Sequence, residues 1–294
     1  MTEPTAPFGR VLTAMVTPFT AGGELDLEGA ARLADHLVRQ GNDGLVVNGT
    51  TGESPTTSRQ EKADLVRAVA DAVGGQAHVV AGVGTYDTAG TVELAQDAAK
   101  AGADGVMAVT PYYSRPPEAG LLAHYERVAA STDLPLMLYD IPARTGLALS
   151  HRLLVRLAQV PQVVAVKDAK DDVGATARLL AEAELAVYSG TDALNLPLLA
   201  VGAVGAVSVV SHVVTPQLVQ MVQAYGAGDV ARARELNAAL QPVYAGMFRT
   251  QGVVLAKAAL ALQGLPSGPV RLPLVDATAE QVAVLREDLA GVLA

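Results

Sequence analysis

Lys167 is the side chain with the clearest chemical potential in the sequence, because it directly follows the apolar run 163–166. An ammonium group at the end of a buried strand loses solvation, which lowers its pKa and supplies the neutral amine that attacks a carbonyl. The alternative is a structural lysine that pairs with Asp168 or extends to solvent. Lys257 lies in the apolar stretch 253–262 and is the one rival, with an expected structural role. The remaining lysines are expected to be exposed: Lys62, Lys100 and Lys170.

A phenol and further hydroxyl groups are predicted to lie near that amine. Tyr139 ends the apolar run before the one that carries Lys167, so both should face the same end of a parallel barrel. A phenol there can move protons to and from a carbinolamine oxygen, provided that a partner relays them. Thr50 and Tyr113 are the candidates, since hydroxyl groups both donate and accept hydrogen bonds. For either tyrosine the alternative is a core residue with a solvated hydroxyl.

Two further features suit the binding of carboxylates. The loop 49–53 reads GTTGE and offers hydroxyl groups and glycine-flanked backbone N–H groups before a helix. It lacks the lysine of a phosphate-binding loop and the spacing of a dinucleotide fingerprint. Arg144, in the loop sequence PARTG, can clamp a second carboxylate, and a surface salt bridge is the alternative.

Composition and spacing argue against several other chemistries. The formal charge is −9, which gives no general attraction for nucleic acid, so none is an expected partner. The sequence has no cysteine, which excludes disulfides, thiolate catalysis and cysteine-bound metals. The histidines are scattered without ligand spacing, so no metal is expected. Ser54 and Ser208 have no obvious His and Asp partners, which argues against a serine hydrolase.

The candidate residues need a scaffold that gathers strand ends, and the sequence predicts one. Short apolar runs alternate with amphipathic segments, which is typical of parallel strands joined by right-handed crossovers. The eight strand-like runs are 12–16, 44–47, 78–81, 105–109, 134–139, 163–167, 186–189 and 206–209. The clearest helical segments between them are 27–39, 59–73, 88–101 and 118–131. Eight units without a linker favour a closed (β/α)8 TIM barrel of the α/β class, and an open doubly wound sheet is the alternative.

After the eighth run the alternation ends, and only helices are predicted. They cover 217–225, 230–243, 253–263 and 279–293, with a loop rich in Pro and Gly at 264–273. We therefore expect a catalytic barrel of residues 8–226 and a C-terminal all-helical appendage of residues 227–294.

Two segments bear on where the protein resides. The stretch 196–214 is uncharged and long enough to suggest a membrane helix, but its Pro, Gly, Ser and His residues favour helix, turn and buried strand. We therefore expect no membrane partner. The first ten residues have no signal-peptide pattern, and we expect a short disordered lead-in to a cytoplasmic protein.

Five phrases at the predicted strand ends form a recognisable set. They are GTTGES at 49–54, TPYY at 110–113, YDIPARTG at 139–146, VKDAK at 166–170 and YSGTDALNLP at 188–197. In order and spacing they resemble the dihydrodipicolinate synthase and N-acetylneuraminate lyase family, from about residue 11 to the C-terminal helices. The double threonine and Arg144 make the chain more similar to the synthases of that family than to its other aldolases.

The resemblance implies a catalytic set. Lys167 would form the imine with pyruvate, and Tyr139 would be the general acid and base. Thr50 and Tyr113 would complete the proton relay, with Tyr113 extending into the site of a neighbouring subunit.

The same resemblance implies a substrate-binding set. Thr51 would help to hold the pyruvate carboxylate, and Arg144 would bind the carboxylate of aspartate 4-semialdehyde. Gly190 and Val207 would line the pocket.

The activity implied by the resemblance is a class I aldolase-type condensation of pyruvate with L-aspartate 4-semialdehyde to 4-hydroxy-tetrahydrodipicolinate. This is the first step of the diaminopimelate and lysine branch, it needs no cofactor, and the family usually forms homotetramers. One alternative is another pyruvate-dependent aldolase of the family that acts on a hydroxy-2-oxo acid. The other is a barrel that binds or regulates without catalysis.

The sequence departs from the family pattern at several positions. Asp140 and Thr191 replace residues common among relatives, at positions that look peripheral to the chemistry. The region that matches the family's allosteric lysine site holds Arg59, Lys62, Tyr86 and Gly90, that is, two cations and no carboxylate. Such a site would repel the ammonium groups of L-lysine, so weak or absent feedback inhibition is expected.

Overall fold

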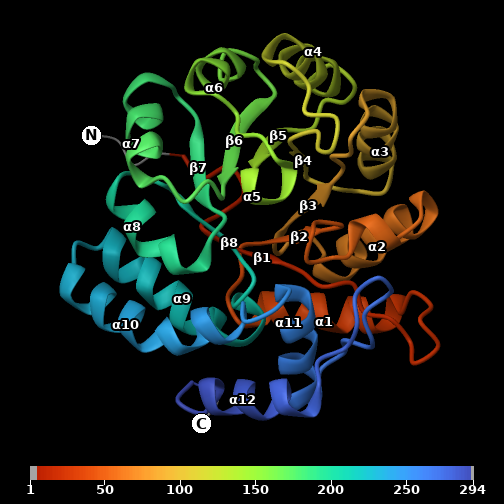
Figure 1. Cartoon of the computed structure of the whole chain (residues 1–294), viewed down its shortest axis with the longest axis vertical. Helices are drawn as coiled ribbons and strands as arrows, with labels where there is room; N and C mark the ends of the chain where they lie inside the picture. The colour runs from red at the N-terminus through yellow and green to blue at the C-terminus, as the bar shows by residue number, and fades with distance from the viewer. Residues whose placement is uncertain (1–4, 293–294) are drawn as a thin grey trace.

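The computed structural model describes residues 5–292, in which eight parallel strands close into a barrel (Figure 1). Each strand pairs with the next in the sequence, and the eighth pairs with the first. The strands are β1 Val11–Ala14, β2 Gly44–Val47, β3 His78–Gly82, β4 Gly105–Val109, β5 Leu136–Asp140, β6 Val163–Asp168, β7 Ala186–Ser189 and β8 Gly205–Ser208. The predicted TIM barrel is therefore confirmed, and the open sheet is wrong.

Helices surround the barrel, and local signals set many of their ends (Figure 1). The α2 helix begins with a capping box formed by Ser58 and Glu61, and it ends at Gly74 in the left-handed conformation. The helices up to β8 and shortly after it are α1 Leu27–Arg39, α2 Arg59–Val73, α3 Thr88–Lys100, α4 Glu118–Ala129, α5 Pro142–Thr145, α6 His151–Leu157, α7 Val173–Glu182, α8 Asn195–Ala200 and α9 Ser211–Gly226. Two 3-10 turns, η1 Ser54–Thr56 and η2 Asp192–Leu194, follow β2 and β7.

The boundaries of β5 and β6 bear on the site. β5 begins at Leu136, two residues later than predicted, because Pro135 has no N–H to donate to a ladder. Both strands extend one residue further than predicted, to Asp140 and Asp168, which pair with each other in register.

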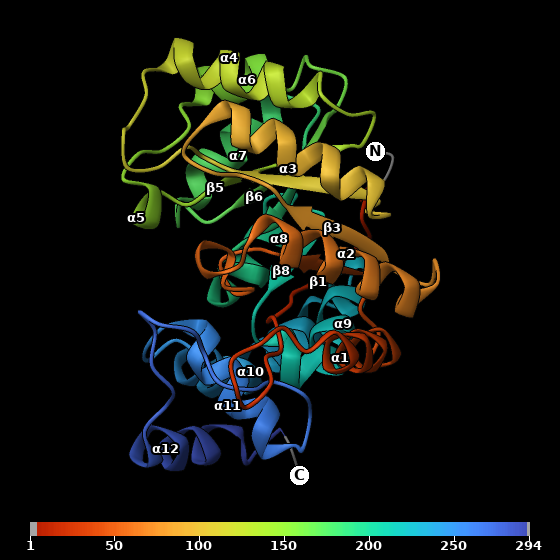
Figure 2. The ribbon, with the colours of Figure 1, turned by 90° about the vertical axis from the view of Figure 1, so that its right-hand side faces the viewer.

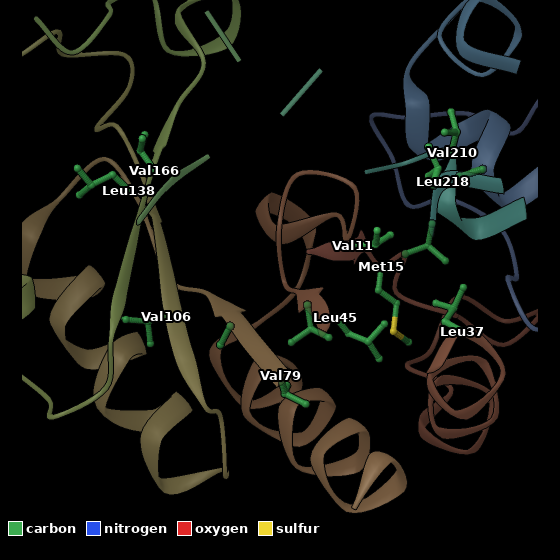
Figure 3. Close-up of a cluster of buried hydrophobic side chains, with 14 of the residues drawn as sticks. Val11, Met15, Leu37, Leu45, Val79, Val106, Leu138, Val166, Val210 and Leu218 are labelled. Carbon is green, nitrogen blue, oxygen red and sulfur yellow. The ribbon is translucent and has the colours of Figure 1, made fainter. Parts of the chain in front are cut away.

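Successive side chains of each strand point alternately outward and inward, so the strands contribute to two separate hydrophobic cores. Outward side chains, together with the covering helices, form the larger cluster, part of which Figure 3 shows between the strands and helices α1 and α9. Inward side chains form a smaller cluster inside the barrel, which includes Met137, Tyr139 and Ala165. Because successive side chains of a strand point to opposite faces, Lys167 points inward like Ala165.

The C-terminal region packs as helices against one side of the barrel (Figure 2). It consists of α10 Val230–Gly246, α11 Gly252–Leu262 and α12 Ala279–Leu289. Helices α10 and α11 both contact α9, and α12 packs on α10 and α11. The predicted C-terminal helices are therefore present, while the division at residues 226 and 227 stays a prediction.

The uncharged stretch 196–214 is divided between α8, β8 and the start of α9. Within residues 5–292 there is no helix of the length and apolarity that a membrane crossing requires. The interpretation of this stretch as helix, turn and buried strand is thus correct.

The segment before β1 closes the barrel from inside, so the prediction of a disordered lead-in is wrong for residues 7–10; residues 1–4 lie outside the described part. Phe8 is buried, and its backbone N–H donates to the hydroxyl of Tyr188 at 3.1 Å. The Tyr188 hydroxyl donates in turn to the carbonyl of Gly9 at 2.9 Å. A methyl group on Gly105 would lie 2.4 Å from the Phe8 ring, which explains the glycine at the start of β4.

Candidate active site

Lys167 and Tyr139 lie side by side at the carboxyl ends of β6 and β5. They are direct partners in the strand register, and both side chains point into the barrel. The Nζ atom of Lys167 lies 4.4 Å from the centroid of the Tyr139 ring. Each residue is only 5% exposed. The phenol and the amine therefore share one small, poorly hydrated space.

Burial changes the charge of that amine. Loss of solvation lowers the pKa of Lys167 to about 8, the nearby carboxyl of Asp192 opposes the change, and the cation of Arg144 adds to it. With such a pKa, roughly a tenth of the Lys167 side chains are neutral at pH 7, against roughly one in three thousand for an ordinary lysine. The site thus holds a reactive amine at neutral pH.

Tyr139 is suited to hold and transfer a proton. Burial raises the pKa of its phenol, while the cation of Arg144 and a hydrogen bond with the side chain of Thr50 lower it. The phenol is therefore protonated at neutral pH, and it has a hydroxyl partner through which a proton can leave.

Tyr113 is not brought to this pair within one chain. Its side chain is 94% exposed, and its backbone adopts the left-handed conformation with φ of 70°. Tyr112 instead packs edge to face on Tyr86, with ring centroids 5.7 Å apart. A tyrosine ring held almost wholly outside its own chain is an unusual exposure of apolar surface, and it suits a contact with a second chain.

A cleft of about 540 Å3 opens beside the pair. Its walls include Thr50, Tyr139 and Arg144. Lys167 does not itself line the walls, but its Nζ lies 4.4 Å from the centroid of the Tyr139 ring, which does. Both terminal nitrogens of Arg144 donate to the side-chain oxygen of Gln251 at 3.3 Å, which directs the guanidinium along the cleft. The surface salt bridge considered as an alternative for Arg144 is not observed among the described residues.

The GTTGES loop places its two threonines differently. Thr50 is exposed to the cleft, whereas Thr51 is 9% exposed. The carbonyl of Gly52 accepts a hydrogen bond from the Thr17 hydroxyl at 2.6 Å, and Glu53 is buried in the left-handed conformation with φ of 54°. The loop is thus tied to its surroundings directly after the two threonines.

Gly190 lies close to Lys167, and Val207 lies inside the barrel. A methyl group on Gly190 would lie 3.0 Å from Cγ of Lys167 and 3.0 Å from the carbonyl of Asp168. Any side chain at that position would therefore press on the lysine. Val207 is buried in the inner cluster, where it pairs with Leu12 in the register of β8 and β1.

Sequence reasoning missed Asp192, a fully buried carboxyl that follows β7. Its oxygens accept hydrogen bonds from the Ser208 hydroxyl and from the backbone N–H groups of Val209 and Val210, the latter two at 2.9 and 3.2 Å. Burial raises the pKa of Asp192. The sequence signal for it is an acidic residue three positions after a strand end, in the phrase SGTD. Its negative charge raises the pKa of Lys167 and so opposes part of the effect of burial.

A polar cluster on the outer face of β5 and β6 corrects a second prediction. Lys170, expected to be exposed, has an 11% exposed side chain and bridges Asp168 at 2.8 Å and Asp140 at 3.5 Å. Asp140 also accepts the backbone N–H of Leu149 at 3.2 Å, which closes the loop that carries Arg144. Burial raises the pKa of Asp140 to about 6, against the opposing charge of Lys170. Asp140 points away from the reactive pair but supports this loop.

Lys62 was also wrongly expected to be exposed. It is half-buried, and its Nζ donates to the carbonyls of Ser54 and Thr57. Burial lowers the pKa of Lys62 to about 8. The lysine therefore stabilises the turn after the GTTGES loop.

The prediction that the region around Arg59 lacks carboxylates is wrong. The Arg59 guanidinium pairs with Glu93 and Asp97 of α3. Asp87 lines the same end of the cleft. Both cations of this region are therefore already engaged by groups of the chain itself.

Within residues 5–292, no group of three or more His, Asp and Glu side chains is arranged to hold a metal ion. The chemistry that the described residues can offer is that of a buried amine, a phenol, hydroxyl groups and a guanidinium.

Comparison with known proteins was consistent across sequence and structure. The model of the dihydrodipicolinate synthetase family matches residues 7–291. The chain is similar to 4-hydroxy-tetrahydrodipicolinate synthase of Acidothermus cellulolyticus, with 65% identity over 97% of this chain and 93% of the relative. It is 62% identical to 4-hydroxy-tetrahydrodipicolinate synthase 2 of Streptomyces coelicolor, over 98% of this chain and 96% of the relative. The crystal structure of the Cyanidioschyzon merolae DHDPS with lysine bound superposes with a TM-score of 0.96 at 40% identity, covering 99% of this chain and all of the other.

The pKa of Lys167 predicts how imine formation varies with pH. Below pH 8 the rate constant for reaction with a subsaturating 2-oxo acid should rise about tenfold per pH unit, because only the neutral amine attacks. Above that pH it should level off. Stopped-flow absorbance of the imine measures this, and the urea-unfolded chain serves as the control. A folded protein whose rate still rises steeply above pH 9 would contradict the lowered pKa.

Proposed function

This chain belongs to the dihydrodipicolinate synthetase family, and we propose that it condenses pyruvate with L-aspartate 4-semialdehyde to 4-hydroxy-tetrahydrodipicolinate. The observation that carries the proposal is the buried amine of Lys167 beside the phenol of Tyr139, at the barrel end where strand ends and loops form the cleft. The relatives named for this activity cover nearly the whole chain, which supports the choice of substrates.

The reaction begins with attack of the neutral Nζ of Lys167 on C2 of pyruvate. The carbinolamine loses water as Tyr139 gives a proton to the departing hydroxyl, which leaves a protonated imine. Loss of a proton from C3 then gives the enamine, because the imine nitrogen accepts the electron pair. No cofactor is needed for this step.

The enamine carbon attacks the aldehyde carbon of the second substrate, and a proton is returned to the new alkoxide. The amino group of the semialdehyde portion then attacks C2, and Lys167 leaves as the free amine while the ring closes. One water is released in all, and the lysine is regenerated.

The proton relay of the proposal consists of Tyr139, Thr50 and a Tyr113 contributed by a neighbouring subunit. The bond between Thr50 and Tyr139 supports the first contact. The almost complete exposure of Tyr113 supports the second, since the ring is free to enter another chain's cleft. We accordingly propose a self-associating protein, a homotetramer as is usual in the family.

The carboxylates of the two substrates are assigned to different loops. Thr51 and the backbone of its loop would hold the pyruvate carboxylate, and Arg144 the carboxylate of the semialdehyde. Gly190 and Val207 would shape the space around the imine. The role in the diaminopimelate and lysine branch and a cytoplasmic location follow from this activity as part of the same proposal.

Two other functions are weighed against this one. A family aldolase acting on a different hydroxy-2-oxo acid would use the same lysine and tyrosine but would not need Arg144. A non-catalytic binding barrel would have no reason to keep a lysine buried at the cost of its charge.

Weak or absent inhibition by L-lysine remains a proposal, now with a different physical reason. Arg59 is engaged by Glu93 and Asp97, so it is not free to bind the carboxylate of an incoming amino acid. Lys62 is likewise engaged by the turn beneath it.

The activity is tested by a coupled assay that offers the semialdehyde and a panel of other aldehydes with pyruvate. We expect the semialdehyde to give the highest kcat/KM. Arg144→Ala should raise the KM for the semialdehyde about 10- to 100-fold, because a charge-assisted bond to its carboxylate is lost, and leave the KM for pyruvate unchanged. A wild-type preference for another acceptor, unaffected by Arg144→Ala, favours the other aldolase.

The contribution of Tyr113 in trans predicts complementation. Tyr113→Phe should lower kcat about 10- to 100-fold, since the relay loses a hydroxyl but keeps the ring. Mixed with inactive Lys167→Ala protein and allowed to exchange subunits, it should regain activity above the sum of the two. If exchange is verified by mass spectrometry and activity does not rise, Tyr113 does not act across the interface.

The feedback proposal is tested by titrating L-lysine into the condensation assay. Little or no inhibition is expected at sub-millimolar lysine. A lysine-inhibited relative measured in parallel controls for the assay. Strong inhibition of this protein at that concentration overturns the proposal.

A further inference from the structure

A buried ion pair joins the GTTGES loop to the C-terminal helices. The Oε1 atom of Glu53 lies 2.6 Å from the Nζ atom of Lys257, and the two side chains are 1% and 4% exposed. Glu53 belongs to the loop after β2, and Lys257 to the apolar helix α11. A charge pair so well removed from water is expensive to break from one side, because the remaining charge is left without a partner.

A second cation completes the contact. The backbone N–H of Arg271 donates to the other carboxylate oxygen of Glu53 at 2.8 Å. The Arg271 guanidinium binds Glu61 at the start of α2 at 2.6 Å and the carbonyl of Thr56 at 2.9 Å. Arg271 of the C-terminal region thus holds both ends of the segment that runs from the loop to α2.

An aromatic ring fills the space between the two cations. The centroid of the Phe19 ring lies 4.2 Å from Nζ of Lys257 and 4.1 Å from the guanidinium carbon of Arg271. Gly268 allows this approach, since it has φ of 66° and a methyl group there would lie 1.8 Å from the carbonyl of Phe19. We call the set of Phe19, Glu53, Lys257 and Arg271 the C-terminal clamp.

The clamp is connected to the threonines by a short turn. The backbone N–H of Glu53 donates to the carbonyl of Thr50 at 3.1 Å, and that of Ser54 to the carbonyl of Gly49 at 3.2 Å. Because this turn is closed on itself, fixing the side chain of Glu53 fixes the positions of Thr50 and Thr51. Hydrophobic residues at the same place would hold the helices together equally well or better, so burying charge here needs a reason other than stability.

We propose that Glu53 and Lys257 are positioning residues for the condensation, which hold Thr50 against Tyr139 and Thr51 against the pyruvate carboxylate. This inference rests on the proposed function. The clamp therefore acts on the proton relay and on pyruvate. Arg144, the proposed partner of the semialdehyde, lies in the short helix α5 and contacts the C-terminal region at Gln251, which is not part of the clamp.

The test uses three clamp variants: Lys257→Met, Glu53→Gln and the double variant that combines these two substitutions. Each is compared with Asp288→Asn. The last is the matched control, since the ion pair of Arg249 and Asp288 that it breaks joins two parts of the C-terminal region to each other and not to the loop. Kinetic constants are normalised to the fraction of subunits trapped by borohydride at saturating pyruvate, and deuterium exchange is followed in peptides covering residues 49–57.

Lys257→Met should lower the normalised kcat about 10- to 100-fold and raise the KM for pyruvate, because a displacement of about 1 Å is enough for such losses. The KM for the semialdehyde should stay within about twofold, and the loop amides should exchange faster. Asp288→Asn should change none of these. Glu53→Gln, which keeps its shape and the bond from Arg271, should give a smaller loss in the same direction, so the test survives if Lys257→Met fails to fold. The double variant should regain thermal stability over Lys257→Met, since no lone charge is left, without regaining kcat.

Normal kinetics in folded Glu53→Gln and Lys257→Met would falsify the positioning role, as would a recovered kcat in the double variant. Unchanged loop exchange in Lys257→Met overturns the clamp whether or not the protein catalyses the condensation. Absence of condensation by the wild type, with faster loop exchange in the variant, refutes the proposed function and leaves the clamp's hold on the loop intact.

Discussion

Desolvation of Lys167 is the constraint on which the rest of the site depends. An amine 5% exposed inside a closed barrel loses the water that would keep it charged, and its pKa falls to about 8. Barrel closure brings this about, because the neighbouring strands place Tyr139 on one side of Lys167 and Tyr188 on the other in the register. Gly190 leaves the room that the lysine needs.

The polar groups around the barrel mouth are divided between its inner and outer faces. Inward groups can touch a substrate, whereas Asp140, Asp168 and Lys170 satisfy one another on the outer face and close the loop that carries Arg144. The C-terminal helices add a second support through the ion pair of Glu53 and Lys257. The loop that carries Arg144 and the GTTGES loop thus each have an anchor outside the cleft.

Much of this architecture could be predicted from the sequence. The apolar periodicity indicates the order of the strands and which of their side chains point into the barrel, and it therefore places Lys167 beside Tyr139. Partners distant in the chain could not be predicted. Lys257 and Lys167 both lie in apolar stretches, and only the fold shows that the first has a carboxylate partner. The burial of Lys62 and Lys170 depends in the same way on loop closure, and that of Asp192 on the hydrogen bonds it receives.

The most direct test of the account is borohydride reduction in the presence of pyruvate, followed by peptide mapping with mass spectrometry. The account predicts a single pyruvate-derived adduct per subunit on Lys167, none on Lys257, and none anywhere in Lys167→Ala. An adduct on Lys257, or no adduct in folded protein, would contradict it.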